Sequence, residues 1–232
     1  MEDILLLHGA IGSKAQLLPL SAELEDQYRV HALDLCGHGG ETFPLMPFSI
    51  PLFAEQVLTY LEQHKLEKVH VFGYSMGGYI AMYLAKQQPQ KIMKLITLAT
   101  KFHWDKDVAE KEVKMLDPEL IEQKIPAFAE QLKERHAPAD WKKLLEKTRE
   151  LLLQLGRQNT LQPGDYMGIA TPSLLLLGDR DKMITQEETT AVYRQLPFAE
   201  FGILPGTPHP IEQVDMDMLA FLIKRFLRKP KA

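Results

Sequence analysis

The chain has 232 residues, of which 45% are hydrophobic, and it carries a formal net charge of −4 at pH 7. This length suits one large α/β core, and the interspersed charges exclude the basic surface that binds nucleic acids or anionic membranes. With one cysteine, Cys36, no internal disulfide can form, so we expect a reducing compartment. The stretch MEDILLLHGA lacks a secretory pattern, and no run approaches the ~20 apolar residues of a membrane span. A cytoplasmic protein is therefore expected.

Short apolar runs alternate with helical patterns along the chain. The runs predict strands buried on both faces, because they are almost continuously apolar. They are Ile4–Leu7, Arg29–Leu35, Lys68–Gly73, Lys94–Ala99, Ser173–Gly178 and Ala199–Leu204. The helical patterns between them are Lys14–Glu25, Ile50–His64, Met76–Gln87, Gln186–Gln195 and Glu212–Arg228. This alternation predicts an α/β fold with a doubly wound, mostly parallel sheet of about six strands and helices on both faces.

Residues 101–165 break this alternation, because they contain helical patterns and no strand candidate. Asp117 and Pro118 have the residue types of an N-cap and a first helical position. Pro126 should split the helix that they start. A longer amphipathic helix follows, and Gly156 is expected to end it.

These boundaries predict a core domain of residues 1–100 and 166–232 and a helical cap of residues 101–165. The insertion follows the fourth strand, so it leaves the sheet at the carboxyl edge, where ligands bind. Most of its apolar surface should pack on the core, and the remainder could form an acyl pocket. The candidate pocket residues are Phe102, Trp104, Phe128, Trp141 and Leu145.

The stretch VFGYSMGGYIAMYLA passes from an apolar strand directly into an amphipathic helix, with Ser75 at the corner. Such a corner strains the serine backbone and requires small residues two positions away on either side, which Gly73 and Gly77 are. A phosphate-binding glycine loop is the alternative, but its spacings differ. We therefore interpret Ser75 as a nucleophile, with the N–H of Met76 directed at the developing oxyanion.

A serine nucleophile needs a base and an acid that orients the base. His209 follows the last strand and so reaches the sheet edge that carries Ser75. The alternative is a turn histidine held between two prolines. The acid is expected in LLLLGDRDKMIT, where Asp179 and Asp181 are both candidates. Either aspartate could instead cap the next helix or pair with a neighbouring cation.

Taken together, these segments resemble the α/β-hydrolase family over nearly the whole chain. GYSMGG, LLLHGAIGS, DLCGHGGET and LLLLGDRDKMIT occur in the family's order, and His209 precedes the last helix. The resemblance implies that Asp181 is the acid. It also implies that the N–H of Ala10, with Ile11 as the fallback, is the second oxyanion donor. His8 is then expected to shape the oxyanion loop through hydrogen bonds.

The resulting expectation is a carboxylesterase-like serine hydrolase that cleaves a small-molecule carboxylic ester or thioester through an acyl-enzyme. No metal or organic cofactor is implied, and neither nucleic acid nor a membrane is an expected partner. Two alternatives stay open. One is a lyase similar to that of the menaquinone pathway, which has an arginine at the place of Tyr79. The other is a non-catalytic ligand-binding protein, against which the Ser75, Asp181 and His209 set argues.

Overall fold

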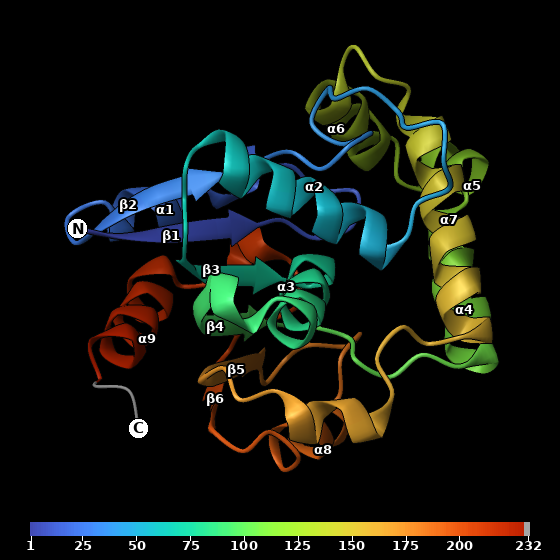
Figure 1. The fold of residues 1–232 in the computed structure, drawn as a ribbon. Helices are drawn as coiled ribbons and strands as arrows, with labels where there is room; N and C mark the ends of the chain where they lie inside the picture. Colours follow the sequence, from blue (N-terminus) through green and yellow to red (C-terminus); the bar gives the residue numbers. More distant parts are fainter. Residues whose placement is uncertain (230–232) are drawn as a thin grey trace.

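The computed structural model describes residues 1–229, which fold around a parallel sheet (Figure 1). The strands are β1 (Glu2–Leu7), β2 (Tyr28–Ala32), β3 (Val69–Tyr74), β4 (Ile92–Leu98), β5 (Ser173–Gly178) and β6 (Ala199–Leu204). Their order across the sheet is β2-β1-β3-β4-β5-β6, and all neighbours are parallel. The predicted doubly wound α/β fold is confirmed.

The helices of residues 1–229 are α1 (Leu18–Leu24), α2 (Ile50–Gln63), α3 (Met76–Gln87), α4 (Lys106–Val113), α5 (Pro118–Lys124), α6 (Pro126–His136), α7 (Trp141–Arg157), α8 (Gln186–Tyr193) and α9 (Met216–Arg228). Apart from α3, they begin at a capping side chain or a proline. The carboxylate of Asp117 accepts a hydrogen bond from the N–H of Leu120 and so caps α5. Pro126 starts α6 immediately after α5 ends, so the predicted split is confirmed.

Hydrophobic cores lie on both faces of the sheet, and β1 contributes to each. Leu5 and Leu7 pack in the core under α2, α3 and α8, whereas Ile4 and Leu6 pack in the core under α1 and α9. All four side chains are fully buried. Successive side chains of a strand point to opposite faces, so burial of both faces explains why the strand is apolar throughout.

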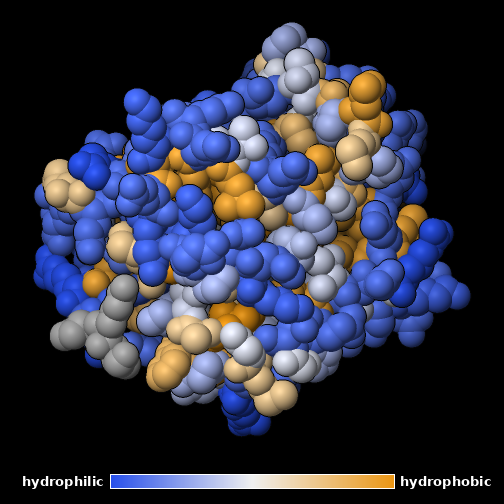
Figure 2. Space-filling model, viewed as in Figure 1, coloured by the Kyte–Doolittle hydropathy of each residue, from blue (hydrophilic) through white to orange (hydrophobic). Residues whose placement is uncertain are grey.

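Helices α4–α7 lie between β4 and β5 in the chain. Figure 1 shows them on the side of the molecule toward which the strands point. Helix α4 packs against α7, and α5 packs against α6. Figure 2 shows hydrophilic residues over most of this view, with hydrophobic ones in separate patches. Within residues 1–229, no helix has the length and apolar character needed to cross a membrane.

Several predicted element ends differ from the structure by a few residues, for example α9, which begins at Met216 rather than Glu212, and two differences have a local cause. β2 ends at Ala32 rather than Leu35, because the N–H of Leu35 donates to the imidazole of His8 instead of continuing the sheet ladder. Gly156 lies inside α7 rather than after it. A side chain at Gly156 would overlap Ala109, so this glycine allows α4 and α7 to approach closely.

Candidate active site

Ser75 occupies the corner between β3 and α3 with φ 51° and ψ −117°, a conformation that non-glycine residues rarely adopt. Its N–H donates to the carbonyl of Leu98 at 2.9 Å, which holds the corner against β4. A Cβ on Gly73 would overlap the backbone of Gly77, and a Cβ on Gly77 would overlap the carbonyl of Leu7. Strand β3, helix α3 and strand β1 therefore approach closely enough to maintain the strained serine.

His209 and Asp181, from the loops after β6 and β5, form a hydrogen-bonded pair. Nδ1 of His209 donates to Oδ2 of Asp181 at 2.8 Å, and the side chains are 13% and 0% exposed. The other carboxylate oxygen accepts from the N–H groups of Met183 and Ile184, at 2.8 and 2.9 Å. Burial raises the pKa of Asp181, but these hydrogen bonds and the His209 ring outweigh burial, so the pKa lies below its usual value. The carboxylate is thus held as an anion beside the imidazole.

Asp179, the other candidate acid, has a different partner. Its Oδ1 accepts from the N–H of Thr207 at 3.1 Å, and its Oδ2 lies 3.6 Å from Nε of Arg180. The carboxylate therefore ties the loop after β5 to the loop before His209. Of the two aspartates that the residue pattern left open, Asp181 is the one bonded to the imidazole.

Tyr74 joins Ser75 and His209 in a way that was not predicted from the sequence. Its hydroxyl donates to the backbone carbonyl of His209 at 3.0 Å, and the two rings lie 5.6 Å apart. Burial raises the pKa of Tyr74, so the hydroxyl keeps its proton. Because Tyr74 directly precedes Ser75, it couples the position of the histidine loop to that of the serine corner.

The oxyanion-loop candidate is a turn from Gly9 to Gly12, closed by a 3.1 Å bond from the Gly12 N–H to the Gly9 carbonyl. His8 also bonds that carbonyl, through Nδ1 at 2.8 Å, while its Nε2 accepts from the N–H of Leu35 at 3.1 Å. These partners fix the neutral tautomer with the proton on Nδ1. In a trans peptide the C=O and N–H point in opposite directions, so fixing the Gly9 carbonyl also fixes the direction of the Ala10 N–H.

Ser75, His209, Ala10, Ile11 and Met76 all line one cavity of about 790 Å³. Met76 is the first residue of α3, where backbone N–H groups have no partner within the helix. The structure therefore brings together the proposed nucleophile, the proposed base and the three residues considered as oxyanion donors. Among residues 1–229, no group of three or more His, Cys, Asp or Glu side chains is arranged to hold a metal ion.

The rest of the cavity is mainly apolar, and residues 101–165 contribute much of it. Apolar residues of this segment that line the cavity include Trp104, Met115, Leu116, Phe128, Leu151 and Leu152. Its charged side chains are paired, Lys101 with Glu112 at 3.6 Å and Arg135 with Glu212 at 3.3 Å. No sequence signal set Arg135 apart from the solvated charges of α6.

The predicted pocket residues lie in different places. Trp104 and Phe128 line the cavity, but Phe102, Trp141 and Leu145 do not. The ring of Phe102 packs in the core against Tyr79 and Tyr166. Trp141 and Leu145 are buried in a separate cluster between α5, α6 and α7. An amphipathic stripe predicts burial, but it does not distinguish the surface of a pocket from contacts between helices.

Comparison with known proteins places the chain in a family. Residues 4–149 match the family described as alpha/beta hydrolase fold. A putative esterase/lipase of Haemophilus influenzae is 23% identical over 97% of this chain and 83% of its own. A pimeloyl-[acyl-carrier protein] methyl ester esterase of Aeromonas salmonicida is 38% identical, but over only 42% of this chain and 37% of its own. A thermophilic esterase structure from Thermogutta terrifontis superposes with a TM-score of 0.78 at 23% identity, covering 100% of this chain and 91% of the other.

The family match covers more than half of the chain, and the solved structure shares its fold over the full length. The chain therefore belongs to the α/β-hydrolase family. Its relatives include proteins named as esterases.

Proposed function

We propose that the protein is a serine hydrolase that cleaves a small-molecule carboxylic ester or thioester through an acyl-enzyme. The observation that carries this proposal is the 2.8 Å bond between His209 and Asp181, with His209 and Ser75 lining the same cavity. This arrangement suits a base oriented by an anion and directed at a nucleophile. The esterase relatives support the same class.

In the proposed mechanism, Oγ of Ser75 attacks the substrate carbonyl carbon and its proton passes to Nε2 of His209. Asp181 holds the ring through Nδ1 and stabilises the imidazolium. The N–H groups of Ala10 and Met76 bind the oxyanion, and each contributes on the order of 3 kcal/mol to transition-state stabilisation.

Collapse of this intermediate breaks the bond to the alcohol or thiol, which leaves with the proton held by His209. Water then attacks the acyl-serine and gives a proton to His209. The second collapse releases the acid and returns the proton to Ser75, so the enzyme is regenerated.

The cavity supports an apolar acyl group as the part of the substrate that binds. Its charged side chains are already paired, so an added charge on the acyl chain would lack a free counterion. We further propose that residues 101–165 act as a cap, because Trp104, Phe128 and Leu152 approach the cavity that contains Ser75.

Tyr79 bears on the lyase alternative. Its hydroxyl accepts from the N–H of Leu161 at 2.8 Å and donates to the side-chain oxygen of Asn159. Tyr79 also lines the cavity, but its hydroxyl is already engaged and carries no charge. It therefore does not offer the anion binding that an arginine would at this position, which favours hydrolysis.

The test is hydrolysis of matched acyl esters and thioesters whose chains increase in length, followed in the presteady state. We expect a burst of alcohol or thiol equal to the enzyme concentration, then steady turnover. Purified, folded protein that cleaves none of these substrates and shows no burst would contradict the proposal.

A further inference from the structure

The last turn of α6 forms hydrogen bonds to the backbone of the proposed oxyanion loop, Gly9–Gly12. His136 donates from Nε2 to the carbonyl oxygen of Ile11 at 3.0 Å, and Nη1 of Arg135 lies 3.3 Å from the same oxygen. His136 is fully buried, and the side chain of Arg135 is 18% exposed. Two consecutive residues of the inserted helices thus bond one carbonyl next to Ser75's cavity.

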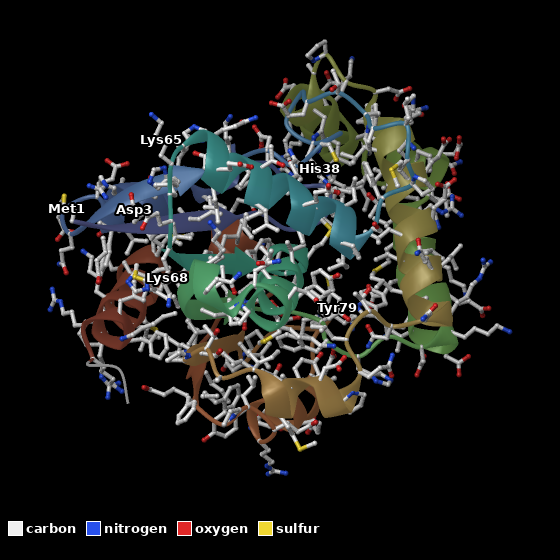
Figure 3. All side chains as sticks on the ribbon, viewed as in Figure 1. Met1, Asp3, His38, Lys65, Lys68 and Tyr79 are labelled. Atoms are coloured by element: carbon white, nitrogen blue, oxygen red, sulfur yellow. The ribbon has the colours of Figure 1, made fainter. Side chains whose placement is uncertain are left out.

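The orientation of His136 is fixed from its other side. The N–H of Gly39 donates to its Nδ1 at 2.9 Å, so the proton lies on Nε2, facing Ile11. A Cβ on Gly40 would lie 2.7 Å from the carbonyl oxygen of Ala137, so the end of α6 sits directly on this loop. Figure 3 shows His38, from the same loop, close to α6, and its ring lies 6.1 Å from that of His136.

The turn that receives this contact needs support. Ile11 has φ 50°, a left-handed conformation that is costly for a β-branched residue. The turn is held at both ends: His8 and Gly12 bond the carbonyl of Gly9, and α6 bonds the carbonyl of Ile11. The Ala10 N–H belongs to the same peptide group as the Gly9 carbonyl, and Ile11 is the next residue after Ala10.

We propose that His136, assisted by Arg135, is a positioning residue that holds the Ala10 N–H in place for the oxyanion. The inserted helices then contribute to the chemical step as well as to binding. The catalytic part of this inference rests on the proposed function. The competing interpretation is that His136 only fills space and stabilises the fold.

The decisive variants are His136→Leu, which removes both hydrogen bonds, and His136→Gln, whose amide can still donate to Ile11. Leu132→Ala is the matched control, because Leu132 is fully buried on the same helix, in the cluster packed against Ile11, but its side chain has no hydrogen-bond donor for the Ile11 carbonyl. We expect His136→Leu to lower kcat roughly 10- to 100-fold with KM changed less than threefold. His136→Gln should recover most of kcat, and Leu132→Ala should keep it.

If His136→Leu does not fold, His136→Asn replaces it, because its shorter amide can serve Gly39 but cannot reach Ile11. A second readout does not depend on turnover: the exchange rate of the Gly12 amide, whose N–H closes the turn. We expect at least tenfold faster exchange in His136→Leu or His136→Asn, and rates near wild type in His136→Gln and Leu132→Ala.

The two readouts separate the two proposals. A wild-type protein without ester turnover would contradict the proposed function, and the Gly12 exchange rates would still decide whether α6 braces the turn. Faster exchange with an unchanged kcat would overturn the catalytic role of His136. Unchanged exchange in the folded variants would overturn the brace itself. A fall in kcat that Leu132→Ala reproduces equally would assign the effect to stability.

Discussion

Two regions line the same cavity: the loops that follow the strands, and helices α4–α7. The two regions differ in how their side chains are positioned. Ser75 and the His209–Asp181 pair lie at the edge of a sheet whose central strands are buried on both faces, and bonds such as that from Tyr74 connect them. Helices α4–α7 reach the cavity with apolar side chains and touch the reactive region mainly through the contact of α6 with Ile11. In the proposed mechanism, the strand ends therefore carry the catalytic residues, whereas helices α4–α7 contribute apolar surface to the cavity and one contact with the proposed oxyanion loop.

The largest expected effect lies on the strand-end side. Ser75→Ala should lower ester turnover by roughly 10⁵-fold or more while the free energy of unfolding changes little, because the nucleophile is lost but the corner remains. The measurements are kcat/KM and a urea denaturation curve. Comparable turnover in the folded variant would remove Ser75 from the mechanism.

A smaller loss is expected at the acid. Asp181→Asn should lower kcat by about a thousandfold or more, because the imidazole loses its orienting anion. Asp179→Asn is the matched control and should reduce kcat less than tenfold, since that carboxylate bonds Thr207 instead. Steady-state kinetics of both purified variants measure the difference, and a reversed ranking would make Asp179 the acid.

The histidines where α6 meets the loops after β1 and β2 predict that the fold is less stable in acid. Burial lowers the pKa of His8 and His38 and lowers that of His136 to about 4, whereas an unfolded histidine has a pKa near 6.5. Below about pH 6.5 these histidines therefore bind more protons in the unfolded chain than in the native chain. The free energy of unfolding should fall as the pH drops toward 4, by up to about 1.4 kcal/mol per pH unit for each such histidine.

Urea denaturation at pH 7, 6 and 5 measures this slope. In His136→Gln the slope should be smaller by up to about 1.4 kcal/mol per pH unit, because the substituted side chain does not titrate. A stability that is constant from pH 7 to 5 would show that these histidines do not remain neutral in the native state.

In helices α4–α7, substitutions of Phe128 and Trp141 should distinguish an effect on substrate binding from an effect on stability. Phe128→Ala should raise KM for a medium-chain acyl ester roughly 5- to 30-fold, since apolar contact in the cavity is lost. Trp141→Ala should destabilise the fold by about 3–5 kcal/mol, because its ring is buried between helices, and should raise KM less. The account of the cavity would be wrong if Trp141→Ala raised KM more than Phe128→Ala.

The smallest signal comes from fluorescence. The chain has two tryptophans, Trp104 on the cavity and Trp141 away from it. Binding of an apolar acyl analogue should change the emission of the Trp141→Phe variant, which retains Trp104, and leave that of Trp104→Phe nearly unchanged. Equal responses from both variants would argue that the ligand does not lie against Trp104.

The same contrast explains what could be predicted from the sequence. Strands buried on both faces appear as apolar runs, and the Ser75 corner needs glycines that stand next to it, so local patterns predict both. Residue types alone left Asp179 and Asp181 undecided, because both lie in one loop. The contact with His209 that separates them spans 28 positions.

Long-range contacts account for what was missed. Tyr74 reaches His209 and His136 reaches Ile11 across more than 100 residues, which no local pattern encodes. The stripe on α7 likewise predicted burial but not the neighbour, so Leu145 was assigned to the pocket although it packs between helices. Strand-end chemistry is therefore more predictable from sequence than the surface of the inserted helices.

The most direct test of the central claim is covalent labelling with a fluorophosphonate, followed by intact mass and peptide mapping. We predict one adduct per chain, on Ser75, that forms rapidly in the wild type and much more slowly in Asp181→Asn. Ser75→Ala should remain unlabelled. Labelling of another residue, or no adduct on folded wild-type protein, would contradict a serine nucleophile at the corner between β3 and α3.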